Sequence, residues 1–104
     1  MSDRDKVILL GDFPKRVGDI PDLTFDYSAL IPATESISTH TAHITDMAGV
    51  DMDSTMKVQS SVSGEFVIFR VQAGTVGKSY RAIVSATMTG GSKYFAEIRL
   101  EIVA

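Results

Sequence analysis

The chain has 104 residues, a net charge of -3 and no cysteine. This length fits one domain with one modest core, and the lack of cysteine excludes disulfides, thiolate metal sites and a cysteine nucleophile. The negative charge argues against a nucleic-acid surface, and no apolar run approaches the ~20 residues of a membrane helix. The run Val7–Leu10 is too short for a signal-peptide core, so we expect nothing to direct the chain out of the cell in which it is made.

The first segment predicts an extended N-terminal arm over residues 1–21, followed by a folded domain over residues 22–104. Met1–Lys6 is charged and is expected to fray, and Val7–Leu10 could form an edge strand. Gly11–Pro21 holds two prolines and two glycines, which favours an irregular lead-in because residues before proline avoid helix.

The next segments read as strands and turns. Leu23–Leu30 alternates apolar and polar residues, which indicates a half-buried strand, and Pro32 ends it. Glu35–Asp46 is rich in Ser, Thr and Ile and predicts a second strand. Met47–Ser54 is turn-like, with room for a short strand around Val50.

A hairpin is predicted where strands over residues 55–62 and 66–71 flank Gly64 and Glu65. A two-residue loop that begins with glycine suits a type II′ turn. The expected pairs are Val62 with Val67 and Val58 with Val71.

A second hairpin is predicted over Ser79–Val103, where two alternating runs surround Gly90 and Gly91. A two-residue loop would split the apolar faces of the two strands, whereas a three-residue loop over Gly90–Ser92 joins them. Because a slip of one residue inverts every side chain, the apolar faces favour the three-residue loop. The expected pairs are Met88–Tyr94, Ala86–Ala96, Val84–Ile98, Ala82–Leu100, Tyr80–Ile102 and, on the other face, Arg81–Glu101.

The pattern as a whole gives six or seven short strands and no convincing helix, which is typical of an all-β sandwich or small barrel. Tyr80 opens a long strand three residues after Gly77. That position fits a structural tyrosine corner, in which the hydroxyl bonds to nearby backbone; the alternative is a plain core aromatic.

Two patterns could carry chemistry, and each departs from its motif. Gly74–Ser79 reads GTVGKS, but Gln72 stands where a phosphate loop needs its first glycine, and a β run follows instead of a helix. Asp51 and Asp53 could begin a calcium loop, but the glycine and glutamate required further along are missing. A non-standard cation site at these two carboxylates stays open.

The histidines His40 and His43 are the only two in the chain. Three positions apart on a strand, they point to opposite faces and form no chelating pair, so we expect two exposed polar residues. No nucleophile, base and acid occur in a catalytic pattern. The sequence therefore predicts no catalytic, metal or cofactor site and no enzyme.

Apolar residues also fall on the faces that alternation turns outward. If Val67, Phe69, Val84 and Ile98 face the core, four other large side chains face solvent, and a cluster of that kind marks a protein interface. The alternative is imperfect alternation within the core. The predicted interface residues are Phe66, Ile68, Ile83 and Phe95.

Four stretches carry a resemblance to a known family. They are LTFDYSALI at Leu23–Ile31, ESIS at Glu35–Ser38, the strand and AGTVGKSY at Val67–Tyr80, and the Thr-rich strand, turn and closing strand at Ala82–Val103. In this order they resemble small phage virion proteins of the fiber-tail adaptor or tail-attachment type. The resemblance implies an Ig-like antiparallel β-sandwich of six or seven short strands with an extended N-terminal arm.

The same resemblance implies a non-enzymatic structural component of a bacteriophage virion, made in the host cytoplasm. Such a domain would connect the tail or neck to fibers or to neighbouring tail proteins, as a homo-oligomer in the particle. The outward apolar residues and the arm Ser2–Pro21 would be its contact surfaces, with no nucleic acid or membrane as partner. The alternative is an Ig-like ligand- or carbohydrate-binding module of a bacterial surface or adhesin protein.

Overall fold

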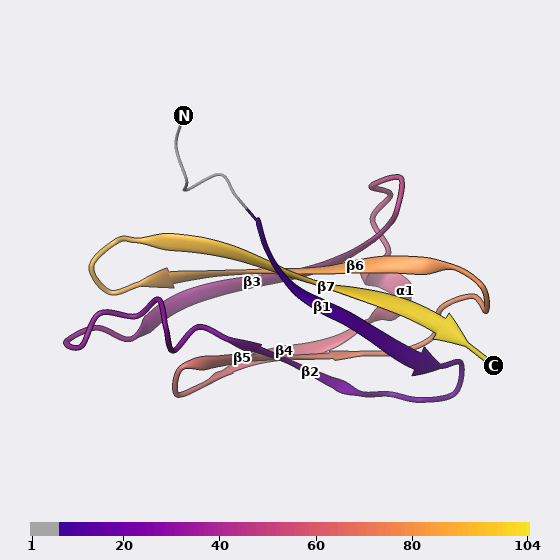
Figure 1. Cartoon of the computed structure of the whole chain (residues 1–104), viewed down its shortest axis with the longest axis horizontal. Helices are drawn as coiled ribbons and strands as arrows, with labels where there is room; N and C mark the ends of the chain where they lie inside the picture. Colours follow the sequence, from indigo (N-terminus) through magenta and orange to yellow (C-terminus); the bar gives the residue numbers. More distant parts are fainter. Residues whose placement is uncertain (1–6) are drawn as a thin grey trace.

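The computed structural model describes residues 7–104 and shows two β-sheets packed face to face (Figure 1). The four-stranded sheet has the order β1 (Val7–Arg16), β7 (Lys93–Val103), β6 (Ser79–Met88) and β3 (Ile37–Asp46). The three-stranded sheet has the order β2 (Asp22–Asp26), β5 (Phe66–Val71) and β4 (Lys57–Ser63), and a one-turn helix, α1 (Asp53–Met56), precedes β4. The predicted all-β sandwich is confirmed, with seven strands. Met1–Lys6, which was expected to fray, lies outside the described residues.

The core lies between the two sheets and is built by the alternation of the strands. Every second residue of β2, β5, β6 and β7 turns inward, because successive side chains of a strand point to opposite faces. The fully buried large side chains include Leu23, Phe25, Phe69, Val84 and Leu100. The inward faces predicted from the sequence are therefore the faces that pack.

The closing hairpin has its loop one residue earlier than predicted. Thr87 pairs with Lys93, and the Met88 amide donates to the Ser92 carbonyl at 2.7 Å, which leaves a loop over residues 89–91. Gly91 has φ 102°, which suits the left-handed position that ends a three-residue hairpin loop. The loop length was right, but the predicted pairs are wrong by two positions, and the shift keeps every apolar face inward. The observed pairs include Tyr80–Leu100, Ala82–Ile98, Val84–Ala96 and, on the outer face, Arg81–Arg99.

The β4–β5 hairpin matches its prediction at the turn and departs from it at the far end. Gly64 has φ 61°, as the first central residue of a type II′ turn requires. Val62 pairs with Val67 as predicted. The predicted partner of Val71 was Val58, but a β-bulge inserts Val58 as an extra residue and leaves Lys57 opposite Val71.

Strand β1 reaches further than the predicted edge strand. Gly11–Arg16 was expected to be irregular, but it continues β1 and pairs parallel with β7. Pro14 is tolerated because β1 lies at the sheet edge, where one N–H has no strand partner. Lys15 is buried, and its ammonium donates to the carbonyls of Arg16 and Val17 at 2.9 and 3.2 Å. Burial lowers the pKa of Lys15, an effect that the charge of Asp19 opposes.

Two segments between the strands differ from their predictions. Strand β2 ends at Asp26, not at Leu30, because the Asp26 carboxylate accepts the Ser28 amide at 2.8 Å and turns the chain. Helix α1 was not expected, since Ser54 and Thr55 are poor helix formers. Its last residue, Met56, is fully buried and anchors that single turn to the core.

Candidate functional site

The four predicted interface residues occupy two outer faces of the sandwich rather than one. Phe66 and Ile68 lie on β5 and alternate with buried residues, so they face out of the three-stranded sheet. Ile83 on β6 and Phe95 on β7 face out of the four-stranded sheet in the same way. Phe66 is 38% exposed, and the other three are half-buried. The structure therefore groups them as two separate pairs, with the core between the pairs.

The outer face of the three-stranded sheet has an apolar centre and a charged border. Ile68 stands between Thr24 of β2 and Ser61 of β4. Two residues after Ile68 on β5, Arg70 donates two hydrogen bonds to Asp22 at 2.8 and 3.2 Å. These bonds hold the pKa of Asp22 below its usual range and raise the pKa of Arg70. Both side chains are exposed, so the pair orients the polar border of this face more than it stabilises the fold.

The outer face of the four-stranded sheet carries a charged cluster beside its apolar residues. Arg81 stands directly opposite Arg99, and the Glu97 carboxylate lies 3.7 Å from a nitrogen of each. Glu97 is only 8% exposed, so its negative charge separates two cations that would otherwise repel across the strands. On the same face, the Lys93 ammonium lies 5.3 Å from the centre of the Phe95 ring, a cation–π contact.

Tyr80 contacts the turn that precedes its strand. Its side chain is buried, and its hydroxyl accepts the Thr75 amide at 3.1 Å. This is a bond from a core tyrosine to backbone five residues upstream, the type of contact that the tyrosine-corner interpretation requires. The turn it fastens contains the GTVGKS stretch, and strand β6 follows directly, so no helix faces that loop.

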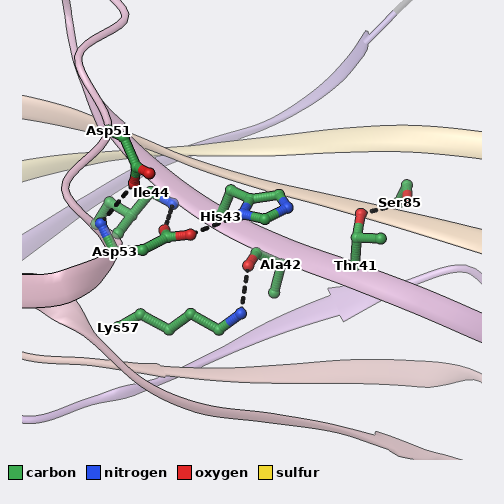
Figure 2. Close-up of polar contacts among 8 residues, drawn as sticks. All are labelled: Thr41, Ala42, His43, Ile44, Asp51, Asp53, Lys57 and Ser85. Atoms are coloured by element: carbon green, nitrogen blue, oxygen red, sulfur yellow. Dashed lines mark hydrogen bonds and ion pairs between the residues drawn. The ribbon is translucent and has the colours of Figure 1, made fainter.

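The histidines lie on opposite faces of β3, as predicted, but each has a partner. The His40 Nε2 lies 3.0 Å from the Ser60 hydroxyl on β4. The His43 Nδ1 lies 2.7 Å from one oxygen of Asp53, whose other oxygen accepts the Ile44 amide at 2.7 Å (Figure 2). His43 is exposed as predicted, whereas His40 is half-buried. The only sequence signal for the His43 contact was the carboxylate of Asp53, ten residues later. That separation is too long for strand spacing to predict a contact.

The pKa of Asp53 reflects this environment. Burial raises it, but the hydrogen bonds from His43 and the Ile44 amide, with the nearby charges of His43 and Lys57, outweigh burial and lower the pKa. Asp53 thus joins the start of α1 to strand β3 in its ionised form.

The aspartates that could begin a cation loop are engaged by backbone amides. Asp51 accepts the Asp53 amide at 2.8 Å, and Asp46 accepts the amides of Ala48 and Val50, both at 2.9 Å. Within residues 7–104, no group of three or more His, Cys, Asp or Glu side chains is placed to hold a metal ion. These acidic residues therefore serve to stabilise turns, which is the ordinary use of aspartate in loops.

Within residues 7–104, no helix is long and apolar enough to cross a membrane.

One apolar surface was missed because its residues come from three separate segments. Val17, Val76 and Val103 are exposed. Val17 directly follows β1 and Val103 is the last residue of β7, and these two strands finish at the same end of the sandwich (Figure 1). The backbone brings the segments together, since the Val17 amide donates to the Val103 carbonyl and the Gly77 amide donates to the Ile102 carbonyl, both at 3.0 Å. Val17 and Val76, which lie outside the strands, were the available signal, because loops usually carry polar residues.

Comparison with known proteins identifies the fold and the family. No curated protein matches the chain. Among solved structures, the chain is similar to a 2,6-sialyltransferase of Photobacterium sp. JT-ISH-224, with 17% identity and a TM-score of 0.51. That likeness covers 96% of this chain but only 19% of the sialyltransferase, and it concerns the fold alone. The family described as podophage GP4 fiber-tail adaptor protein gp77 matches residues 15–101. The chain therefore belongs to this phage fiber-tail adaptor family, as the resemblance of its strands predicted.

Proposed function

We propose that this protein is a non-enzymatic connector that joins the phage tail or neck to fibers or neighbouring tail proteins. Membership of a fiber-tail adaptor family makes the chain a structural virion component that binds other virion proteins. That match, which spans residues 15–101, is the observation that carries the proposal. It favours the connector over a carbohydrate-binding module of a bacterial surface.

The two outer faces of the sandwich suit a connector. A protein that joins two partners needs two contact surfaces that both partners can occupy at once, and faces on opposite sides of a rigid core meet this need. We assign Phe66 and Ile68 to one contact and Ile83 and Phe95 to the other, because large apolar side chains at a surface mark interfaces. The different charge borders of the two faces would direct different partners to each.

Several copies would act together in the particle. A tail has rotational symmetry, and symmetric assemblies repeat one contact between identical chains. The apolar end surface at Val17, Val76 and Val103 is available to such a neighbour. Synthesis in the host cytoplasm before assembly is part of the proposal.

Deletion of the gene, with complementation in trans, tests the proposed function. Particles assembled without the protein should carry filled heads and tail structures that lack fibers, and supplying the protein should restore the fibers. Fibers attached at normal number in the deletion would overturn the connecting role. A matched control supplies a chain with Phe66→Ser and Phe95→Ser, which should be folded but should not restore attachment.

A further inference from the structure

The outer face of the four-stranded sheet holds two arginines with unsatisfied hydrogen-bond donors. Arg81 on β6 and Arg99 on β7 stand directly opposite each other on the two central strands of the sheet. The Nε atom of each is buried and has no hydrogen-bond partner within residues 7–104. Buried donors in folded proteins are nearly always paired, so this arginine pair is incomplete in the isolated chain.

The Glu97 carboxylate holds the arginine pair together but does not satisfy it. One Glu97 oxygen lies 3.7 Å from Arg81 and 3.7 Å from Arg99, whereas a charge-assisted hydrogen bond spans about 2.7–2.9 Å. Two cations and one anion leave a net charge of +1 on the cluster. Asp12 and Glu101 stand beside Arg99 on the same face, but neither forms an ion pair with it in the described part of the chain.

The arginine pair is open to a second anion from the solvent side. The side chains of Arg81 and Arg99 are 41% and 36% exposed, whereas that of Glu97 is 11% exposed. Each guanidinium carries five N–H donors in a planar fork that matches the two oxygens of a carboxylate. A further carboxylate can therefore bind the outer N–H groups while Glu97 stays in place beneath them.

The residues around the arginine pair fit a protein segment better than a free ion. Ile83 and Phe95 are half-buried apolar side chains on the same face. Lys93 adds a cation, with its ammonium 5.3 Å from the centre of the Phe95 ring. A small inorganic anion gains nothing from apolar neighbours, whereas a protein segment covers them as it binds. This positive centre belongs to a chain of net charge -3, so an acidic partner is directed to this face.

We propose that the partner at this face is a virion protein segment that places an aspartate or glutamate carboxylate against Arg81 and Arg99. An apolar side chain of the same segment covers Ile83 and Phe95. The carboxylate accepts an N–H from each guanidinium and completes the cluster as two cations with two anions. This inference rests on the proposed function and deepens it, because it names the chemistry of the partner at one of the two outer faces.

Complementation of the gene deletion tests the arginine pair. Arg81→Glu and Arg99→Glu, made singly, should each restore fewer fibers per particle than the wild-type chain, by about tenfold or more, because each sets a carboxylate against the carboxylate of the partner. Arg81→Lys keeps the charge and loses the planar fork, so its loss should be smaller. Lys78→Glu is the matched control, because it changes the net charge equally in the exposed turn before β6. It should restore fibers fully.

Circular dichroism and thermal unfolding check that each variant folds. Arg81→Glu stands beside Glu97 and carries the greater risk of misfolding. Arg81→Gln removes the cation without adding a charge, and it should reduce fiber attachment in the same direction, by a smaller factor. The proposal is therefore testable with either variant.

Second-site revertants of Arg81→Glu identify the source of the anion. The proposal expects revertants in another virion protein that replace an aspartate or glutamate by a basic or neutral residue. Revertants confined to acidic residues of this chain would overturn it, because a second copy would then supply the carboxylate. Arginine variants that restore fibers like wild type would also overturn it and would leave the connecting role intact. A wild-type chain that restores no fibers would overturn the connecting role and this inference with it.

Discussion

The hydroxyl of Tyr27 donates a hydrogen bond of 2.9 Å to the carbonyl of Val84, from the end of β2 in one sheet to β6 in the other. Both residues are fully buried, and burial raises the pKa of Tyr27 well above its usual value. The Tyr27 hydroxyl therefore stays protonated across the accessible pH range. Its hydrogen bond to Val84 is kept and fixes the two sheets relative to each other.

Replacing Tyr27 by Phe should lower the free energy of unfolding by about 1–2 kcal/mol, because a buried carbonyl loses its donor. Urea denaturation followed by circular dichroism measures the change. Tyr94→Phe is the matched control, since Tyr94 is only partly buried and its hydroxyl makes no hydrogen bond with residues 7–104. Equal stability of the two variants would contradict the role given to Tyr27.

Replacing Glu97 by Gln should destabilise the outer face of the four-stranded sheet by about 1–2 kcal/mol. The substitution removes the charge that separates Arg81 from Arg99, and it leaves two cations opposite each other. High salt should reduce the loss, because salt screens the repulsion. Glu101→Gln on the same face is the control, since Glu101 is exposed and forms no ion pair within the described chain; an equal loss there would disprove the cluster.

The Asp53 carboxylate predicts an acid-sensitive contribution to stability. Its folded-state pKa lies below the unfolded value of about 3.9, so its contribution is complete above that pH and is lost as the pH falls through the folded-state pKa. Asp53→Asn should be about 1 kcal/mol less stable than wild type at pH 7, and the difference should shrink below about pH 4. Denaturation series at both pH values measure it.

Asp12→Asn is the control for that series, because Asp12 is exposed on β1. It should match wild type at both pH values. A difference between Asp53→Asn and wild type that stays constant from pH 7 to pH 3 would show that the charge of Asp53 is not what stabilises the junction of α1 and β3.

Gly74 should tolerate no side chain. It has φ 99°, and an added Cβ would lie 2.7 Å from the side chain of Ile102. Gly74→Ala combines backbone strain with overpacking and should cost about 2–4 kcal/mol. Gly18→Ala meets no atom within 4 Å and has no positive φ, so it should be neutral or slightly stabilising. Thermal unfolding that ranks the two variants equally would contradict this account.

The two outer faces should matter for assembly and not for folding. Phe66→Ser and Phe95→Ser, made singly, should each reduce incorporation into particles at least tenfold while the monomer keeps its unfolding temperature within a few degrees. Quantitative blotting of purified particles measures incorporation. Met47→Ser removes an exposed apolar side chain from a loop and should incorporate normally; if all three variants behave alike, the assigned faces are wrong.

Alternation predicted the strands and the inward faces because it is a local property of the chain. The type II′ turn at Gly64 was equally local, and glycine with a positive φ is its mark. The pairing registers of the two hairpins were harder to predict. The early loop of the closing hairpin preserves which side chains face the core, so the apolar pattern alone could not separate it from the predicted pairs. The bulge at Val58 places Lys57 opposite Val71, and the apolar pattern favoured Val58 at that position.

The site depended even more on contacts between distant segments. The outward apolar residues followed from alternation, but their separation onto two faces required the sheet order, because β5 and β6 are successive strands in different sheets. The bond between His43 and Asp53 and the meeting of Val17 with Val103 join segments whose proximity no local pattern encodes. Proline at residue 14 misled the reading of β1, since an edge strand accepts it.

The most direct test of the connecting role is a cryo-electron microscopy reconstruction of the tail in intact particles. The account predicts density for this seven-stranded sandwich at the junction between tail and fiber, with its two outer faces against different partners. Density for the protein at another site in the particle, or its absence from complete fiber-bearing particles, would contradict the account.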